Sequence, residues 1–263
     1  MDSFKQRADE LFENRPELVM LRQQLRHNQL AAWLVGGCLR DLLLSKPIVD
    51  IDIAVEKDPT EFAQKWAKQN NGRWFWLDQE RLQSRVLLSN QLVVDFAPLR
   101  AAIICGDQCM RDFTINSLAL PLNGEFTSQN LLDPLDGLTD LEHRNLKFCS
   151  TRSIAEDPLR MLKGIRHAVT LQMNLSDQAL QQIREDSATI KSIRDELGKI
   201  LLSDIPVLGF EKLYDTGLLQ ELVGLPSSHW VPTESFADLS QFDQSMREWK
   251  IDEEEEPVAE EPY

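Results

Sequence analysis

The sequence predicts an α+β protein in which a small mixed β-sheet with covering helices is followed by an all-helical region. Two observations predict this division. Short apolar runs and segments of alternating apolar and polar residues, both typical of strands, are confined to residues 31–99. From residue 153 onward the apolar residues recur at helical spacing instead. We therefore expect an α/β part at 1–148, a helical part at 149–225 and an acidic, disordered tail at 226–263.

The expected elements can be placed in order from their residue patterns. Apolar residues three or four positions apart predict helices, whereas short apolar runs and alternating segments such as VDIDIAV predict strands. The helices are expected within 3–30 and at 60–70, and the strands at 31–35, 49–55, 73–77, 85–89 and 91–99. After Asn116 a loop-rich connection leads to residue 148, helices are expected from 153 to 202, and one last helix is expected at 206–222.

The formal net charge of −15 argues at first against a nucleic-acid partner, because lysine and arginine supply phosphate binding. Residues 234–263, however, hold eleven acidic residues against two basic ones and so carry −9 of this charge. Such a tail is typical of a solvated end, and less often of an element that binds a protein partner or mimics RNA. No apolar run approaches the length of a membrane span, so we expect a cytoplasmic protein without a membrane partner.

Two aspartates in the strand at 49–55 point to a metal site. Successive side chains of a strand alternate between its faces, so Asp50 and Asp52 share one face while Ile51 and Ile53 turn to the core. Crowded carboxylates repel each other unless a cation neutralises them, and Mg²⁺ binds one or two carboxylates together with phosphates and water. A two-metal site of this kind suits the transfer of a nucleotidyl group. The alternative is an edge strand with a solvated polar face.

A third carboxylate is generally needed beside such a pair, and Asp95 is the best placed candidate. It lies in the strand-like LVVDF and faces opposite to Val94 and Phe96. An ion pair with Arg85 or Arg100 explains Asp95 equally well.

The segment GGCLRD joins the first expected strand to a helix. Gly36 and Gly37 let the backbone approach a ligand closely, and the helix N-terminus with Arg40 offers positive potential for a triphosphate. A glycine turn alone is a weak indication.

A second polar motif is RDFTIN at 111–116. Taken alone, it is explained by a surface pair of Arg111 and Asp112 and by a helix cap at Asn116. Its significance depends on the other motifs around it in the chain.

The segment EDPLR begins the helical region. Asp157 can cap a helix whose first residue is Pro158. Opposite its apolar stripe the helix presents a polar ribbon, which we expect to face the paired aspartates and which consists of Asp157, Arg160, Lys163 and Arg166. A carboxylate accepts hydrogen bonds and a guanidinium donates them, so an Asp/Arg pair matches the edges of cytosine and adenine and rejects guanine and uracil.

Five ordered motifs, GGCLRD, DID, RDFTIN, DPLDGLTDL and EDPLR, resemble the class II tRNA nucleotidyltransferase and bacterial poly(A) polymerase family over residues 31–225. The resemblance implies a polymerase β-like nucleotidyltransferase head at 1–148 and a helical, nucleotide-selecting neck at 149–225. It also implies that the protein, and not a nucleic-acid template, selects CTP and ATP.

The same resemblance implies roles for individual residues. Asp50 and Asp52 would hold two Mg²⁺ ions, and Asp95 stays the candidate for the third catalytic carboxylate on the strand pattern given above. Gly37 and Arg40 contact the nucleotide. The full set of expected nucleotide-binding residues is Gly36, Gly37, Arg40, Arg111, which binds the phosphates, Asp112, Asn116, Asp157, Arg160, Lys163 and Arg166.

Three departures from the family pattern narrow the expectation. Met110 and Lys163 each stand where the family usually has arginine, so a phosphate contact and a planar hydrogen-bonding fork are lost. Ten residues separate Arg100 from Arg111, where enzymes that add the whole CCA sequence carry a longer loop. The chain also ends soon after the expected neck, which predicts weak or partner-assisted tRNA binding.

Together these observations predict template-independent transfer of CMP from CTP to the 3′ end of tRNA. Transfer of AMP from ATP is a wider alternative. CC addition is favoured over CCA addition. A poly(A) polymerase shares the motifs, although a basic RNA-binding extension would be expected in place of the acidic C-terminus. The remaining alternative is a non-catalytic module that binds nucleotide, RNA or a protein. The retained Asp50 and Asp52 count against it.

Overall fold

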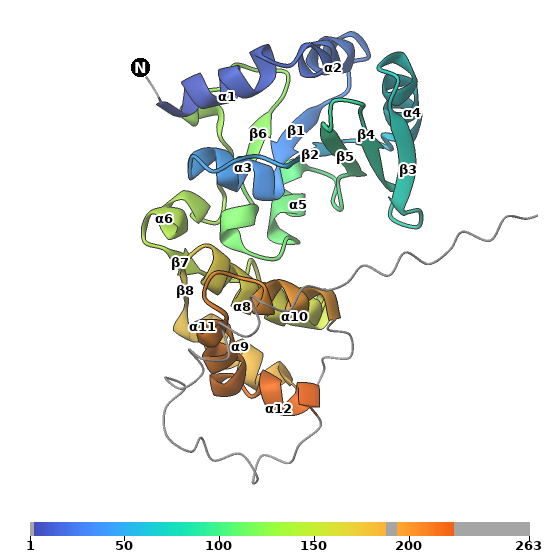
Figure 1. Ribbon diagram of the computed structural model, residues 1–263. Coiled ribbons are helices and arrows are strands. Elements are labelled where there is room, and N and C mark those ends of the chain that lie inside the picture. The colour runs from blue at the N-terminus through green and yellow to red at the C-terminus, as the bar shows by residue number, and fades with distance from the viewer. Residues whose placement is uncertain (1–2, 188–193, 224–263) are drawn as a thin grey trace, which may run out of the picture.

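A computed structural model describes residues 3–187 and 194–223 of the chain and confirms the α+β class (Figure 1). The expected acidic tail at 226–263 lies outside the described residues. The six strands of the main sheet are β1 (Ala32–Val35), β2 (Asp50–Val55), β3 (Arg73–Asp78), β4 (Gln83–Leu87), β5 (Val93–Pro98) and β6 (Ala119–Pro121).

The sheet is mixed, as expected. Its strand order is β3-β4-β5-β2-β1-β6, in which β2 and β5 run parallel and all other neighbours run antiparallel. The sequence analysis missed β6, which was expected to be loop. With three residues paired to β1 at the edge of the sheet, β6 is too short to show an alternating pattern.

Helices surround the sheet. They are α1 (Ser3–Glu13), α2 (Pro16–His27), α3 (Gly36–Leu43), α4 (Thr60–Gln69), α5 (Ile104–Cys109) and α6 (Gly137–Glu142), with the 3-10 helices η1 (Thr114–Asn116) and η2 (Ser128–Asn130). Helix α4 covers one face of the sheet, where the rings of Phe62 and Trp66 lie 6.0 and 5.9 Å from the ring of Phe96 on β5. This leaves the opposite face of β2 and β5 available to polar side chains.

The second half of the described chain is helical, and Figure 1 shows it below the sheet. Its helices are α7 (Ser153–Glu156), α8 (Leu159–Thr170), α9 (Asp177–Asp186), α10 (Arg194–Leu201), α11 (Pro206–Asp215) and α12 (Leu218–Val223). The prediction of one helix at 206–222 was wrong. Gly217, with φ of +75°, adopts the left-handed conformation that glycine tolerates and so separates α11 from α12.

The expectation that strands stop after residue 148 also needs correction. Two-residue strands β7 (Asn145–Leu146) and β8 (Asn174–Leu175) pair in parallel, so a small second sheet ties the loop after α6 to the segment after α8. A strand of two residues has no period, which is why the sequence gives no signal for it.

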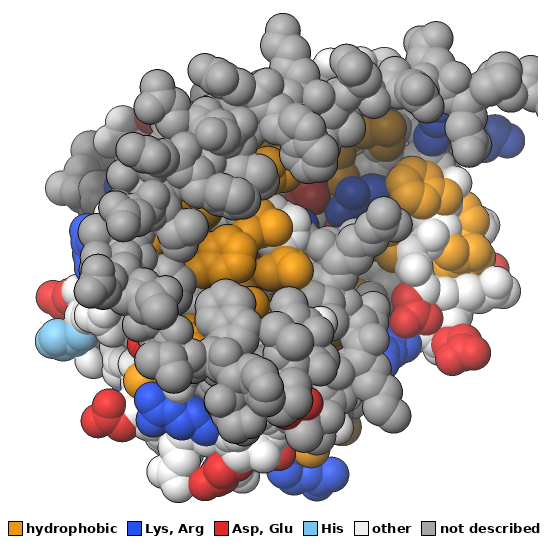
Figure 2. All heavy atoms as spheres, turned by 60° about the horizontal axis from the view of Figure 1, so that its bottom comes forward, with side chains coloured by type: hydrophobic (Ala, Val, Ile, Leu, Met, Phe, Trp, Pro, Cys, Tyr) orange, Lys and Arg blue, Asp and Glu red, His pale blue; other side chains and the backbone are white. Residues whose placement is uncertain are grey.

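A continuous cluster of buried side chains joins both halves. It extends from Phe4 in α1 to Leu219 in α12, and the apolar stripe of α8 contributes Met161, Leu162 and Ile165 to it. Seen from the end where α12 lies, charged side chains of both signs are scattered over the described surface around a central group of hydrophobic side chains (Figure 2). None of the described helices has the length and apolar character needed to cross a membrane.

His167 is an ionisable residue buried at the junction of the two halves. Its ring lies edge-on to Phe113 at 5.5 Å, and its Nδ1 has no hydrogen-bond partner among the described residues. Burial lowers the pKa of His167 well below its usual value of 6.5, and the nearby positive charges of Arg166, Arg40 and Lys163 lower it further. The folded protein therefore keeps this imidazole neutral.

We expect the contribution of His167 to the free energy of unfolding to fall as the pH drops below about 6.5, because His167 takes up a proton in the unfolded chain and not in the folded one. One such group changes the free energy of unfolding by at most about 1.4 kcal/mol per pH unit. Urea unfolding between pH 7.5 and 5.0 measures this slope. His167→Phe should flatten it, whereas His143→Gln, at an exposed position, should not. An equal slope in His167→Phe and the unmodified protein would contradict this account.

Candidate active site

Three aspartates lie on one face of the sheet, opposite to α4. Asp50 and Asp52 belong to β2 and Asp95 to β5, and the parallel register places Asp52 directly opposite Asp95. The intervening Ile51 and Ile53 are buried on the other side. Because neighbouring strands are about 4.8 Å apart, the three carboxylates are crowded together.

The environment of Asp52 makes its negative charge costly. Burial raises the pKa of this carboxyl group to about 6 from an ordinary 3.8, and the charge of Asp95 adds to the effect, while Arg111 opposes it. A cation placed among the carboxylates relieves such repulsion.

Gly36 sits directly against Asp52. A Cβ atom at this position would lie 2.8 Å from Asp52 Oδ2, and the φ of +72° is a conformation that other residues rarely adopt. The glycine turn thus brings the backbone at the start of α3 up to the carboxylates.

Arg85 on β4 already provides one cation. Its Nε and Nη2 donate to the two carboxylate oxygens of Asp95, each at 2.8 Å, and Nη2 also donates to Asp50 Oδ2 at 3.1 Å. The ion pair between Asp95 and Arg85 that the sequence left open is therefore present. Arg100, the other candidate partner, contacts Asp107 instead.

The donor chemistry of this face fits Mg²⁺, since carboxylate oxygens are the ligands that this ion takes from proteins. Asp50 and Asp52 lie on the face of β2 where such a site would form. Yet within residues 3–187 and 194–223, no three acidic, histidine or cysteine side chains are arranged as they stand to hold a metal ion. Two of the three carboxylates are bonded to Arg85.

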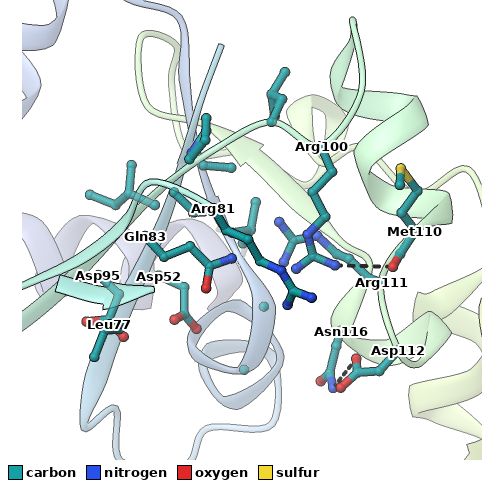
Figure 3. A pocket seen from close by; sticks show the side chains of 18 of the residues that line it. Asp52, Leu77, Arg81, Gln83, Asp95, Arg100, Met110, Arg111, Asp112 and Asn116 are labelled. Carbon is teal, nitrogen blue, oxygen red and sulfur yellow. Dashed lines mark hydrogen bonds between the residues drawn. The ribbon is translucent and has the colours of Figure 1, made fainter. Parts of the chain in front are cut away.

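A cavity of about 770 Å³ opens beside the carboxylates, large enough for a nucleotide. It is lined by residues of the sheet and of the loops after β5 and α5 (Figure 3), and also by residues of the segment that begins α8. The expected site residues that line it are Gly36, Gly37, Asp52, Asp95, Arg111, Asp112, Asn116, Asp157, Arg160 and Lys163. Those that do not line it are Asp50, Arg40 and Arg166.

Arg40 and Arg166 are held elsewhere by neighbouring side chains. Arg40 is buried, where its guanidinium donates to Asp41 and, at 2.8 Å, to Asn116 Oδ1. Arg166 donates to Glu196 of α10 at 2.7 Å. Both contacts bind one element to another, which helical spacing alone could not reveal.

Two arginines that the sequence analysis did not propose as nucleotide contacts also reach the cavity. Arg81 comes from the hairpin between β3 and β4, Arg100 follows β5, and their side chains extend toward Arg111 (Figure 3). Burial lowers the pKa of Arg100, and the neighbouring charge of Arg111 lowers it further. Three guanidinium groups gathered in this way form a site suited to a polyanion.

The buried Asp107 of α5 orients this basic wall. Its Oδ2 accepts hydrogen bonds from Arg111 Nε and Nη2 at 2.9 and 2.7 Å, and its Oδ1 accepts one from the backbone N–H of Arg100 at 3.1 Å. The surface pair of Arg111 with Asp112 is thus replaced by a pair with Asp107. Asp112 instead accepts from Asn116 Nδ2 and from the backbone N–H of Phe113, so it shapes the turn.

Another wall comes from the start of α8. Asp157 Oδ1 accepts from the backbone N–H of Leu159, and its Oδ2 pairs with Lys163 at 3.3 Å. Arg160 is buried and donates to the backbone oxygens of Ser153 and Met110, the latter at 2.9 Å. The cavity therefore has a carboxylate floor on the sheet, a basic wall, and a mixed Asp/Arg/Lys wall.

A mixed sheet with crowded carboxylates beside a glycine turn and an arginine-lined cavity defines a nucleotidyltransferase fold. Residues 32–147 match the family described as the poly A polymerase head domain, and residues 172–227 match the probable RNA and SrmB binding site of polymerase A. The chain belongs to the tRNA nucleotidyltransferase and poly(A) polymerase family.

Known relatives support this assignment. A CC-adding tRNA nucleotidyltransferase of Geobacter sulfurreducens is 40% identical over 187 residues, which are 69% of this chain and 42% of the relative. An A-adding tRNA nucleotidyltransferase of Deinococcus radiodurans is 35% identical over 198 residues, 72% of this chain and 44% of the relative. The structure of the Thermotoga maritima CCA-adding enzyme complexed with tRNA superposes with a TM-score of 0.70 at 26% identity, covering 89% of this chain and 56% of that one. The chain spans about half the length of these relatives.

Proposed function

We propose that the protein transfers CMP from CTP to the 3′ end of tRNA without a nucleic-acid template, adding two C residues. The observation that carries this proposal is the cavity, which is lined by crowded carboxylates, three arginines and the polar start of α8. The relative at 40% identity has the same named activity. AMP transfer from ATP is the wider alternative, since a relative at 35% identity is named as A-adding.

Each wall of the cavity would take one part of the substrate. Arg81, Arg100 and Arg111 suit the triphosphate, because guanidinium groups donate to phosphate oxygens in a fixed fork. Asp157 and Arg160 lie at the other wall and suit the base, with acceptor and donor groups side by side. The 3′-terminal hydroxyl of the RNA would approach over the carboxylate face of β2 and β5.

Mg²⁺ held by Asp50 and Asp52 would supply charge neutralisation at the reacting phosphate and a lower pKa for the attacking hydroxyl. Asp95 would be the third carboxylate of the proposed catalytic site. Burial of Asp52 next to Asp95 makes its negative charge costly, and a divalent cation would relieve this cost.

The compact segment between Arg100 and Arg111 supports CC addition over CCA addition. It forms the six-residue helix α5, and buried Asp107 bonds both to the backbone of Arg100 and to the side chain of Arg111. This arrangement anchors both ends of the segment on one carboxylate. A site in which the segment is fixed in this way has little means of changing its choice from C to A.

We further propose that residues 1–148 act as the head and 149–225 as the nucleotide-selecting neck of a cytoplasmic tRNA-processing enzyme. The pairing of β7 with β8 and the hydrogen bond from Arg160 to the backbone oxygen of Met110 connect the two, so the walls of the cavity keep a fixed relation. A fixed relation is needed if α8 is to read a base whose phosphates lie on the head.

The test is incorporation of labelled CTP, ATP, GTP and UTP, with Mg²⁺, into tRNA transcripts that end before CCA, after C, and after CC. We expect two additions of CMP and no use of ATP on the CC end. Addition of AMP to the CC end would instead assign CCA or A addition, and long tracts of A would assign poly(A) polymerase activity. Folded protein with no incorporation on any transcript would favour the non-catalytic module.

A further inference from the structure

Arg85 occupies an unusual place for a cation in this site. It lies on β4 directly opposite Asp95 on β5, which in turn lies directly opposite Asp52 on β2, so the three side chains form one row across the face of the sheet. This row is fixed by backbone pairing. The guanidinium therefore approaches the carboxylates from within the sheet and not from a mobile loop.

The contacts of Arg85 use the same oxygens that a metal ion would need. Both oxygens of Asp95 accept from Arg85 at 2.8 Å, in the two-pronged geometry of the strongest ion pairs, and Asp50 Oδ2 accepts at 3.1 Å. The Arg85 side chain is 31% exposed and that of Asp95 is 18% exposed, so the pair is partly shielded from water. A shielded two-pronged pair is stronger than a solvated surface pair.

A guanidinium and a divalent cation compete for these oxygens. Mg²⁺ and Mn²⁺ require oxygen ligands in close octahedral contact, whereas guanidinium offers N–H groups and a positive charge. With Arg85 in place, Asp95 and one oxygen of Asp50 are engaged, and like charges would be forced together if an ion entered.

We propose that Arg85 is a resident cation that competes with the divalent metal for Asp50 and Asp95, so that metal binds only as the guanidinium leaves these carboxylates. The proposal rests on the proposed function, because it concerns the metal site of that reaction. It assigns Arg85 as a positioning residue that holds the carboxylates in order before the metal binds and weakens the metal affinity of the free protein.

The experiment is titration of the metal-free chain with Mn²⁺, followed by electron paramagnetic resonance of the unbound ion, without nucleotide or RNA. Arg85→Met keeps the length of the stem and removes the charge, so we expect the Mn²⁺ dissociation constant to fall by about tenfold or more. Arg85→Lys keeps the charge but loses the planar fork and should give an intermediate value. Circular dichroism reports whether each variant folds. If Arg85→Met does not fold, Arg85→Lys provides the test of the proposal.

Arg73→Met is the matched control. Arg73 lies on the same face of the sheet, in the row formed by Leu87, Val93 and Asp50. It is three strands, or about 14 Å, away from Asp50. Its replacement should therefore leave the Mn²⁺ affinity unchanged. The double variant Asp52→Asn with Arg85→Met should lose the gain in Mn²⁺ affinity, because the ion would lack the carboxylate of Asp52.

Equal or weaker Mn²⁺ binding by folded Arg85→Met and Arg85→Lys would overturn the proposal, as would tight binding that survives in the double variant. These outcomes are independent of turnover. Equal Mn²⁺ affinity of the variants and the unmodified chain, together with normal nucleotide incorporation, would contradict the competition and leave the proposed function intact. Tighter Mn²⁺ binding in a chain that incorporates no nucleotide would support the competition and remove the proposed function.

Discussion

Asp52→Asn is expected to abolish nucleotide incorporation and, at the same time, to make the metal-free protein more stable. The amide has no charge with which to hold a divalent cation, and metal-assisted charge stabilisation supplies several kcal/mol to such reactions. A loss of that size lowers the rate by about three orders of magnitude or more. Incorporation of labelled CTP by the variant and the unmodified chain measures the effect.

The gain in stability follows from the pKa of Asp52. Its value of about 6 in the folded protein, above the ordinary 3.8, means that folding favours the protonated form. At pH 7.5 the charge is present and destabilises the fold, by up to about 3 kcal/mol if the unfolded value is ordinary. Asparagine removes this cost, so the advantage of the variant should be complete above pH 6 and fade as the pH falls from 6 to 4.

Urea unfolding of both proteins in the presence of a chelator, between pH 4 and 7.5, measures this difference. Asp177→Asn, at an exposed position in the first turn of α9, is the matched control and should change neither turnover nor the pH profile. Retained incorporation in Asp52→Asn would contradict the metal assignment. Equal stability of the two proteins at pH 7.5 would contradict the cost of the buried charge, whatever the activity.

Local patterns predicted most of the fold. The alternation of VDIDIAV placed β2 and the shared face of its aspartates, because alternation is a property of a strand that needs no knowledge of its neighbours. Among the elements that were missed, the strands β6, β7 and β8 have two or three residues and exist through pairing with distant segments, and the helices α5 and α6 have only six residues each. The break between α11 and α12 depends on the single left-handed residue Gly217.

The site was predictable where chemistry is local and less so where it depends on packing. Asp52, Gly36 and Arg111 reach the cavity from motifs that the sequence shows directly. Arg81 belongs to an ordinary hairpin turn, and no local feature distinguishes it from a solvated arginine. Arg166 has the helical spacing of a site residue, but its place beside Glu196 is decided by how α10 packs on α8.

Arg160→Ala is expected to relax the choice of base more than it weakens binding of the triphosphate. Arg160 lies at the wall of the cavity formed by α8, where two backbone oxygens fix its guanidinium, and it shares one of them, that of Met110, with Arg100. A fixed donor group discriminates between bases by about 1 to 3 kcal/mol. The preference for CTP over UTP, measured as a ratio of kcat/KM, should therefore fall by about tenfold to a hundredfold.

A second variant separates base reading from loss of structure, because Arg160 also joins α8 to the backbone of Met110. Arg160→Lys keeps the charge and can keep one of these bonds, but it lacks the planar fork, so it should fold normally and still select poorly. Arg166→Ala removes an arginine of the same helix that pairs with Glu196 and should leave the base preference unchanged. An unaltered CTP preference in both Arg160 variants would show that the base is selected elsewhere in the cavity, whereas a loss confined to Arg160→Ala would assign the residue to holding α8 in place.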